Sequence, residues 1–255
     1  MRSTLTQPSY VKDTIADLLQ NRVDMSKLVI TKALAKDDYA NKQPHSELAK
    51  RMRERDPGSA PGLGDRVAYV MVKGASGTKN FQNSEDPIFV LEHNVPIDTR
   101  YYLDNQLSKP LGRIFEPILG ASGARSLVTG AHTRTISVAA PTIGGLMKFA
   151  KKTATCMGCK KPLKGKEESG GAVCGDCAPR VGELYMKTMD KVSDLEVRFG
   201  RLWTQCQRCQ GSMHCEVICS SKDCPIFYMR MKAKKDLEDG GKELARFDVD
   251  KAATW

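Results

Sequence analysis

The chain has 255 residues, of which 40% are apolar, and its formal net charge is +10 with an isoelectric point near 9.1. This length suffices for one ordinary domain with smaller modules. The excess of Lys and Arg favours a polyanionic partner, either nucleic acid or an acidic membrane, although a generally basic soluble protein stays open. No apolar run reaches the roughly 18 residues that span a bilayer, and the N-terminal sequence has no apolar segment typical of a secretion signal.

The first part of the chain predicts helices with a few short strands. Apolar residues recur at helical spacing over 11–28, and 28–31 is a β-branched segment typical of a strand. Pro44 can begin a second helix. One side of that helix is basic and carries Lys50, Arg51, Arg53 and Arg55. Such a face is usually solvated, but the helix is followed by a Gly-rich loop at 56–66 and a strand at 67–72, and together they could follow a phosphate backbone.

The next segment predicts one capped helix and then a domain boundary. Asp98 is a good N-cap, and the two tyrosines that follow it are more typical of a core than of a ligand platform. We expect Pro110 and Pro117 to break the structure after this helix. Residues 120–145 are rich in Gly, Ala, Ser and Thr. We therefore expect a loose connection there, with a short strand or two, and the main domain boundary.

Eight of the nine cysteines fall into two sets of four. The first quartet is Cys156, Cys159, Cys174 and Cys177, within a lysine-rich segment. Because we do not expect secretion, we do not expect disulfides either. Two C-x-x-C pairs with fourteen residues between them predict a zinc ribbon, and four free cysteines are the alternative. A module this small has little core, so metal binding would supply its folding energy.

The second quartet is Cys206, Cys209, Cys219 and Cys224. Four thiolates suit zinc and an iron–sulfur cluster alike, so the spacing leaves both open. His214 and Cys215 could substitute as ligands but are more typical of bystanders in the loop. A proline-free helix is predicted at 181–203, which would hold the two quartets apart.

The residues after the second quartet predict a docking surface and a tail. Residues 226–229 form an apolar patch directly after Pro225, and such a patch beside a metal site is typical of a protein-docking surface. The rest of the chain is polar, with a partly helical stretch at 237–247. Asp248 and Asp250 could bind magnesium, but a pair of this kind in a tail is more typical of solvated residues.

No catalytic motif accompanies the cysteines. The sequence has no P-loop, no G-x-G-x-x-G, no H-E-x-x-H and no G-x-S-x-G. An open, catalytic zinc site is not expected either, because the cysteines form complete sets of four. From its residues alone, the chain is a binding and assembly unit.

Several segments resemble the thumb of family B DNA polymerases. The first set comprises 28–32, Tyr39, 42–45, Ala49 and 64–70. The second set is similar to the delta-type members in particular and comprises 85–87, 96–102, 113–119, 201–211 and 224–230. The resemblance covers nearly the whole chain but only the C-terminal part of that subunit. The exonuclease, palm and fingers are not in the sequence, so we expect a part of a longer subunit that is inactive alone.

The resemblance implies an α+β fold: a mainly helical thumb with a small antiparallel sheet, followed by an elongated zinc-ribbon, helix and iron–sulfur module. The implied divisions are a DNA-gripping domain at 1–145, a zinc ribbon at 146–180, a connecting helix at 181–205, an iron–sulfur module at 206–230 and a tail at 231–255. The first quartet would bind zinc and help to engage the sliding clamp. The second would carry a [4Fe-4S] cluster and dock the B-type accessory subunit.

The implied activity is that of a nuclear, DNA-directed DNA polymerase (a nucleotidyltransferase that binds nucleotide and primer–template DNA), with magnesium held only by the absent palm. This chain would supply positioning rather than chemistry. The candidate DNA contacts are Lys32, His45, Arg51, Arg66 and Tyr69. The alternative is a stand-alone zinc-ribbon adaptor that binds nucleic acid, which would explain the quartets and the charge but not residues 28–119.

Overall fold

The computed structural model describes residues 6–36, 39–75, 77–135, 154–163 and 171–247. The chain divides into two compact units: unit 1 comprises Met1–Pro141 with Lys222–Tyr228, and unit 2 comprises Thr142–Ser221 with Met229–Trp255. Helices predominate, and three short strands form an antiparallel sheet, which confirms the predicted α+β class. Over the described residues, no helix combines the length and apolar character needed to cross a membrane.

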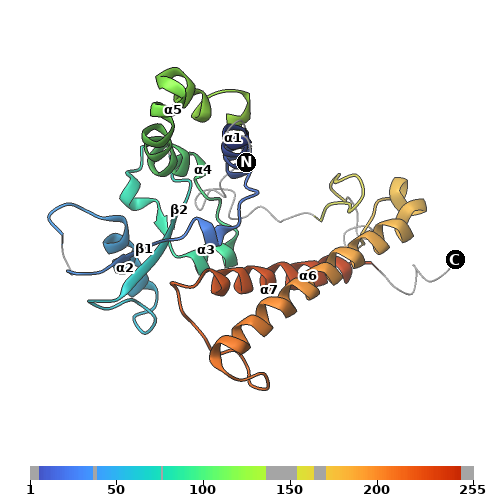
Figure 1. The fold of residues 1–255 in the computed structure, drawn as a ribbon. Coiled ribbons are helices and arrows are strands. Elements are labelled where there is room, and N and C mark those ends of the chain that lie inside the picture. Colours follow the sequence, from blue (N-terminus) through green and yellow to red (C-terminus); the bar gives the residue numbers. More distant parts are fainter. Residues whose placement is uncertain (1–5, 37–38, 76, 136–153, 164–170, 248–255) are drawn as a thin grey trace. The chain divides into compact units, whose positions relative to one another are not determined.

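Unit 1 gathers helices around a small sheet (Figure 1). Its α-helices are α1 (Thr6–Leu19), α2 (Pro44–Arg55), α3 (Pro87–His93), α4 (Thr99–Tyr101) and α5 (Ser108–Val128). Its strands are β1 (Ile30–Ala33), β2 (Arg66–Met71) and β3 (Ser84–Glu85). Short 3₁₀ turns lie at Met25–Lys27, Asn80–Gln82 and Ala131–Thr133, and a π-helical turn, η3, at Tyr102–Leu107 leads into α5.

The strand β2 lies at the centre of the sheet and provides much of the core. It pairs with β1 through the register Ile30↔Tyr69 and with β3 through Val70↔Glu85. The main apolar cluster comprises Leu18, Leu28, Leu34, Leu48, Ala49, Val67, Tyr69, Met71 and Tyr102. The hydroxyl of Tyr102 accepts a hydrogen bond of 3.0 Å from the backbone N–H of Met71. This buried tyrosine is therefore part of the core, as predicted.

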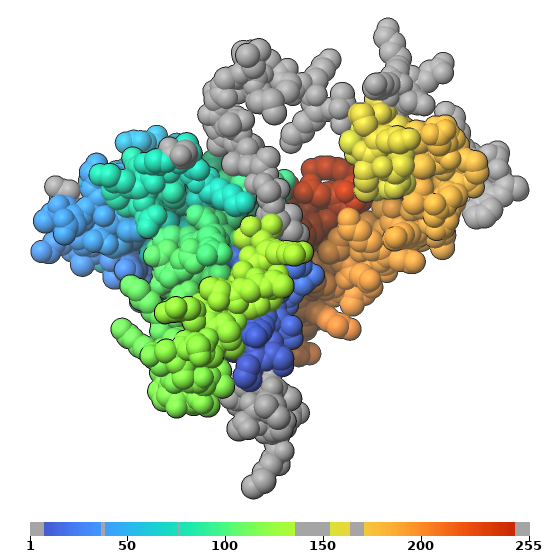
Figure 2. All heavy atoms as spheres, turned by 90° about the horizontal axis from the view of Figure 1, so that it is seen from above, coloured from blue at the N-terminus to red at the C-terminus, as the bar shows by residue number. Residues whose placement is uncertain are grey.

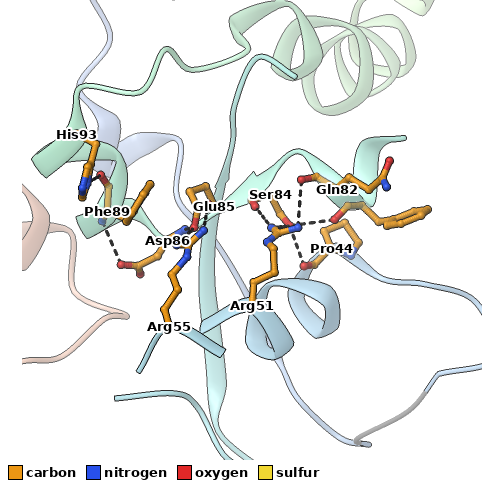
Figure 3. A network of polar contacts seen from close by, with 10 residues as sticks. Pro44, Arg51, Arg55, Gln82, Ser84, Glu85, Asp86, Phe89 and His93 are labelled. Carbon is orange, nitrogen blue, oxygen red and sulfur yellow. Dashed lines mark hydrogen bonds and ion pairs between the residues drawn. The ribbon is translucent and has the colours of Figure 1, made fainter. Parts of the chain in front are cut away.

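Two arginines of α2 hold the short strand β3 in place (Figure 3). Arg55 donates hydrogen bonds of 2.9 and 2.7 Å to the two carboxylate oxygens of Glu85, and this pairing raises the pKa of Arg55. Arg51 donates to the backbone carbonyls of Gln82 and Ser84. A two-residue strand has few ladder hydrogen bonds of its own, so these side chains fix its position. The basic side of α2 is thus partly used inside unit 1.

The helix predicted at 11–28 is shorter at its C-terminal end than the apolar spacing indicated. The structure ends α1 at Leu19, and Asn21 follows with a φ of 56°, a left-handed conformation that Asn tolerates and that stops a helix. Asp24 then caps a separate 3₁₀ turn by accepting a hydrogen bond from the N–H of Ser26. The strand predicted at 28–31 consequently begins two residues later, at β1.

The predicted helix starts are confirmed where a cap or a proline marked them. Pro44 is the first residue of α2. Asp98 accepts a hydrogen bond of 3.0 Å from the N–H of Tyr101 at the start of α4. Asp86 caps α3 in the same way, through the N–H of Phe89, although the sequence analysis did not single it out.

Pro110 does not break the structure, contrary to the expectation, whereas the helical backbone is interrupted at Gly120, three residues after Pro117. The loose connection predicted from residue 120 is not found at 121–128, where the chain is helical. Helix α5 contains both prolines and continues to Val128. Pro110 lies in the first turn of α5, directly after the π-helical turn η3. The helix instead bends at Gly120, whose φ of 72° and ψ of 167° are not helical. The part of this segment at 136–153 lies outside the described residues.

Unit 2 contains a 3₁₀ turn, η6 (Gly175–Arg180), and two long helices, α6 (Val181–Gln210) and α7 (Pro225–Leu244), of which the first residues of α7 belong to unit 1. Helix α6 is longer than the predicted 181–203 and includes Cys206 and Cys209. It ends at Gly211, whose φ of 81° is the left-handed conformation favoured after a helix.

Helix α7 packs against α6. A Cβ atom at Gly240 would lie 3.2 Å from a methyl group of Val192, so the helices approach closely at this glycine. Lys191 and Glu243 form an ion pair of 3.0 Å between the same two helices. The predicted tail at 231–255 is therefore mostly helix, and its last residues, 248–255, which include the predicted aspartate pair, lie outside the described part.

The apolar patch predicted at 226–229 is not an open docking surface. Phe227 is only 6% exposed and Tyr228 only 2%. The hydroxyl of Tyr228 donates a hydrogen bond of 2.8 Å to the carbonyl of Lys222. These rings are buried because the segment is the first turn of α7 and packs inward within unit 1, which helical periodicity alone did not indicate.

We expect Gly120→Ala to lower the free energy of unfolding by about 1–3 kcal/mol, because alanine is strained at this φ and ψ even though its Cβ would meet no atom within 4 Å. The matched control is Gly112→Ala in the same helix, where a Cβ also meets nothing. There alanine should stabilise by up to about 1 kcal/mol. Urea unfolding measures both values, and equal effects of the two changes would contradict the bend at Gly120.

Candidate metal centre

The first quartet comes together in unit 2. The sulfur atoms of Cys156, Cys159, Cys174 and Cys177 all lie within 4.8 Å of one another. The Sγ atoms of Cys159 and Cys174 are 3.7 Å apart. Tetrahedral zinc with Zn–S bonds of about 2.3 Å separates its sulfur ligands by about 3.8 Å. The four thiols therefore have the number, the chemistry and the spacing of a zinc site.

A tight hairpin shapes the first half of this site. Thr155 and Pro162 form a β-bridge, and the N–H of Cys156 donates a hydrogen bond of 2.8 Å to the carbonyl of Lys161. The turn closes with the N–H of Lys160 on the carbonyl of Cys156, and Lys160 has a left-handed φ of 62°. This backbone turn brings the two cysteines of the first C-x-x-C pair to the same side.

The second half of the site leads directly into α6. The N–H of Cys174 donates to the sulfur of Cys156 at 3.3 Å, and the N–H of Cys177 donates to the carbonyl of Cys174 at 3.0 Å. The turn η6 contains Cys177 and continues into α6. In Figure 2 the first half of the module (yellow) lies beside the start of α6 (light orange). The long helix thus supports a module that has few apolar residues of its own.

Backbone hydrogen bonds lower the pKa of the Cys156 thiol. Burial opposes its ionisation, but backbone N–H groups of Cys159, Cys174 and Gly158 outweigh that effect and lower the pKa of Cys156 to about 6. Hydrogen bonding to the Cys156 sulfur raises the pKa of Cys177 to about 12. Without a metal, one thiolate is thus stabilised by its protonated neighbours. Metal binding must displace those protons, so affinity for the metal depends on pH.

The arrangement suits a structural metal. Four cysteine ligands complete a tetrahedral shell and leave no open position for water or substrate. Cys156 is fully buried, whereas Cys159 is exposed at the surface. The site can therefore hold the two halves of the module together, and its chemistry is that of a fold-stabilising metal centre.

Gly158, within the first C-x-x-C pair, leaves room for the opposite pair. A Cβ at this position would lie 2.9 Å from the sulfur of Cys177 and 3.1 Å from a methyl group of Leu184. No prediction from the sequence covered this glycine. Its place between two predicted ligands was the available signal, because a small residue there permits close approach of the second cysteine pair.

The second quartet is not gathered in the same way. Cys206 is buried and Cys209 exposed near the end of α6, Cys219 lies in the following loop, and Cys224 directly precedes α7. In the part of the chain that the structure describes, these thiols do not form a group like that of the first quartet. The metal of the second quartet therefore stays a prediction.

The loop of the second quartet is nevertheless tied down at one ligand. Arg230, which is only 6% exposed, donates a hydrogen bond of 2.8 Å to the carbonyl of Cys219. His214 and Cys215 are exposed on the same loop. The carbonyl of Cys215 accepts a hydrogen bond from the side chain of Gln207.

The five predicted DNA contacts have different surroundings in unit 1. His45 and Tyr69 are buried, and burial lowers the pKa of His45 and raises that of Tyr69 to about 12. Arg51 donates to backbone carbonyls beside β3. Lys32 is exposed, and Arg66 is exposed in an ion pair with Asp223 at 3.1 Å. Because DNA reaches only surface groups, we retain Lys32 and Arg66 as candidate contacts.

Two family models match the chain, in sequence order. The model described as DNA polymerase family B matches residues 3–118, and the model described as C4-type zinc-finger of DNA polymerase delta matches residues 156–230. The two matched regions do not overlap, and the family B match precedes the C4-type zinc-finger match along the chain. The first match covers most of unit 1, and the second begins at the first ligand of the gathered quartet. This match and the geometry of the first quartet together support zinc.

Curated relatives are similar along almost the whole chain. The DNA polymerase delta catalytic subunit of Schizosaccharomyces pombe is 63% identical over 239 residues, which is 94% of this chain and 22% of the relative. The corresponding subunit of Bos taurus is 56% identical over 250 residues, 97% of this chain and 22% of the relative. That of Oryza sativa is 56% identical over 241 residues, 94% of this chain and 21% of the relative. The chain thus spans about a fifth of the relatives' length.

We expect Gly158→Ala to weaken zinc binding about ten-fold or more, because the added Cβ displaces the sulfur of Cys177. The matched control is Gly175→Ala, in the second half of the module, where a Cβ would meet no atom within 4 Å. Competition with a chromophoric zinc chelator measures both affinities. Unchanged zinc affinity in Gly158→Ala would contradict the close approach.

Proposed function

We propose that this chain belongs to a replicative DNA-directed DNA polymerase and supplies its DNA grip and two assembly modules. The observation that supports this most is the order of the two matches, a family B region followed by a delta-type zinc finger on one chain. Relatives of 49–63% identity are DNA polymerase delta catalytic subunits. A stand-alone zinc-ribbon adaptor would leave the match at residues 3–118 without an explanation.

The proposed reaction is attack of a primer 3′-hydroxyl on the α-phosphate of a nucleotide, with pyrophosphate as the leaving group. Bound magnesium ions would activate the hydroxyl and stabilise the charge on the leaving oxygens. The nucleotide and the magnesium belong to the palm of the whole subunit, which is outside this chain. Unit 1 acts by holding the primer–template duplex so that the 3′-hydroxyl stays in position. We accordingly propose a nuclear location and no activity for this chain alone.

The proposed DNA grip uses cations that unit 1 leaves exposed. Lys32 on β1 and Arg66 on β2 are exposed on paired strands. Lys32 is opposite Val67 and Ala33 is opposite Arg66, so the two cations lie on opposite faces of the sheet and would contact different phosphates. Arg66 also donates to the hydroxyl of Thr31 at 2.9 Å, which orients its guanidinium. Its ion pair with Asp223 is solvent-exposed and worth about 0–1 kcal/mol. A DNA phosphate can therefore replace that carboxylate at little cost.

The double change Lys32→Ala with Arg66→Ala should lower duplex affinity and flatten its dependence on salt. Each lost phosphate contact reduces the slope of log K against log salt by about 0.9, so the slope should fall by up to about 2. The control with the same loss of charge is Arg180→Ala with Lys187→Ala, two exposed residues of unit 2. Fluorescence anisotropy with labelled primer–template DNA at several salt concentrations measures both, and an unchanged slope would remove these residues from the grip.

The proposed assembly role places the sliding clamp at the first quartet and the B-type accessory subunit at the second. A closed four-cysteine zinc site has no catalytic position, so the module serves to shape a surface. For the second quartet we propose a [4Fe-4S] cluster, which four thiolates can hold. The hydrogen bond from buried Arg230 to Cys219 supports a loop fixed for ligation. Cys206 and Cys209 are three residues apart on α6, which directs both to one side of that helix.

Anaerobically purified chain should contain about four irons and one zinc and should show the broad charge-transfer absorption of a cluster. Cys219→Ser should lower the iron content and abolish binding of the B-type subunit, while the zinc of the first quartet is retained. Cys215→Ser on the same exposed loop is the control and should change neither. Metal analysis and a pull-down with purified B-type subunit test this. A colourless wild-type protein with two zincs would refute the cluster, and intact binding by Cys219→Ser would refute the docking role.

A further inference from the structure

Arg246, just beyond the end of α7, contacts both halves of the zinc module. Its Nη2 atom donates to the backbone carbonyl of Thr155 at 2.7 Å and to that of Gly171 at 3.1 Å. Its Nη1 atom lies 3.4 Å from the sulfur of Met157. The contacts join residues 75 to 91 positions apart in the sequence. A single guanidinium therefore bridges two chain segments that are remote from it.

The two bridged segments each lead into one pair of ligands. Thr155 directly precedes Cys156, and Gly171 lies three residues before Cys174. Between the segments, the N–H of Met157 donates a hydrogen bond of 2.8 Å to the carbonyl of Ala172. This backbone hydrogen bond and Arg246 therefore both join the two halves of the module, close to the cysteine ligands.

The end of α7 is itself held in place, so Arg246 has a fixed position. The neighbouring Phe247 is 3% exposed and packs edge-to-face on Tyr185 of α6, with ring centroids 5.7 Å apart. The N–H of Arg246 donates to the carbonyl of Glu243 within the last turn. The ion pair between Glu243 and Lys191 connects the same turn to α6. The packing of α7 against α6 therefore fixes the position of the guanidinium beside the module.

We propose that Arg246 is a positioning residue of the zinc site, which keeps the two cysteine pairs at the separation that the metal requires. The inference rests on the assignment of zinc to the first quartet. It gives the end of α7 a role in positioning the ligands, although no residue there binds the metal. The planar fork of arginine can donate to two carbonyls from one nitrogen at fixed angles. A lysine at this position offers one ammonium on a flexible stem and should replace the bridge only in part.

The test compares zinc release from the full chain and from Arg246→Met, which keeps an apolar stem and removes the donors. We expect the variant to bind zinc about ten-fold more weakly, as is typical when a group that orients metal ligands is lost. Arg246→Lys should recover part of the affinity. Cobalt(II) substituted at the first quartet should show weaker and broader ligand-field absorption in Arg246→Met, because the tetrahedral geometry is less well held.

The matched control is Lys191→Met, which breaks the α6–α7 ion pair beside Arg246 and leaves the bridge to the module in place. It should keep wild-type zinc affinity and the wild-type cobalt spectrum. Wild-type affinity and spectrum in Arg246→Met would overturn the proposal, as would an equal loss in Lys191→Met. If the wild-type chain itself binds no zinc, the zinc assignment fails. If the wild type and both variants bind zinc equally well, only the positioning role of Arg246 fails. If Arg246→Met does not fold, the comparison of Arg246→Lys with Lys191→Met decides the question.

Discussion

Four sulfur atoms within 4.8 Å of one another are the constraint on which unit 2 depends. Backbone N–H groups lower the pKa of Cys156 to about 6, and hydrogen bonding to the Cys156 sulfur raises the pKa of Cys177. Four thiolates this close would repel one another. A divalent metal removes this conflict by accepting electron density from all four. The module therefore folds around its metal, since it has few apolar residues to bury.

The two long helices, α6 and α7, pack together and support the metal site. Helix α6 begins one turn after the last zinc ligand, and α7 packs against it at Gly240 and through the Lys191–Glu243 pair. Because Arg246 follows the end of α7, the packed helices also fix a side chain that contacts both halves of the metal site. Metal ligation and helix packing thus stabilise the same small module, and a proposed docking surface for other subunits gains rigidity from both.

In unit 1, charged side chains of α2 stabilise the fold rather than binding a metal. Its shortest strand, β3, is held by Arg51 and Arg55 of α2, whose donors go to carbonyls and to Glu85. Two basic residues that a reader of the sequence would assign to DNA or to solvent are thereby part of the fold. The cations that remain exposed, among them Lys32 and Arg66, are the ones available to a phosphate backbone.

The first quartet and the helix starts marked by Pro44 and Asp98 could be predicted from the sequence, because spacing and capping are local properties. The α+β class was implied by the resemblance. The resemblance to family B polymerases was likewise visible in short segments. Tertiary structure alone decided the rest. It decided that His45 and Tyr69 are buried and that α5 continues through Pro117. It also brought Arg246 into contact with residues 75 to 91 positions away in the sequence. All three depend on which segments pack together. No local pattern encodes such contacts, since their energy arises only when distant residues meet.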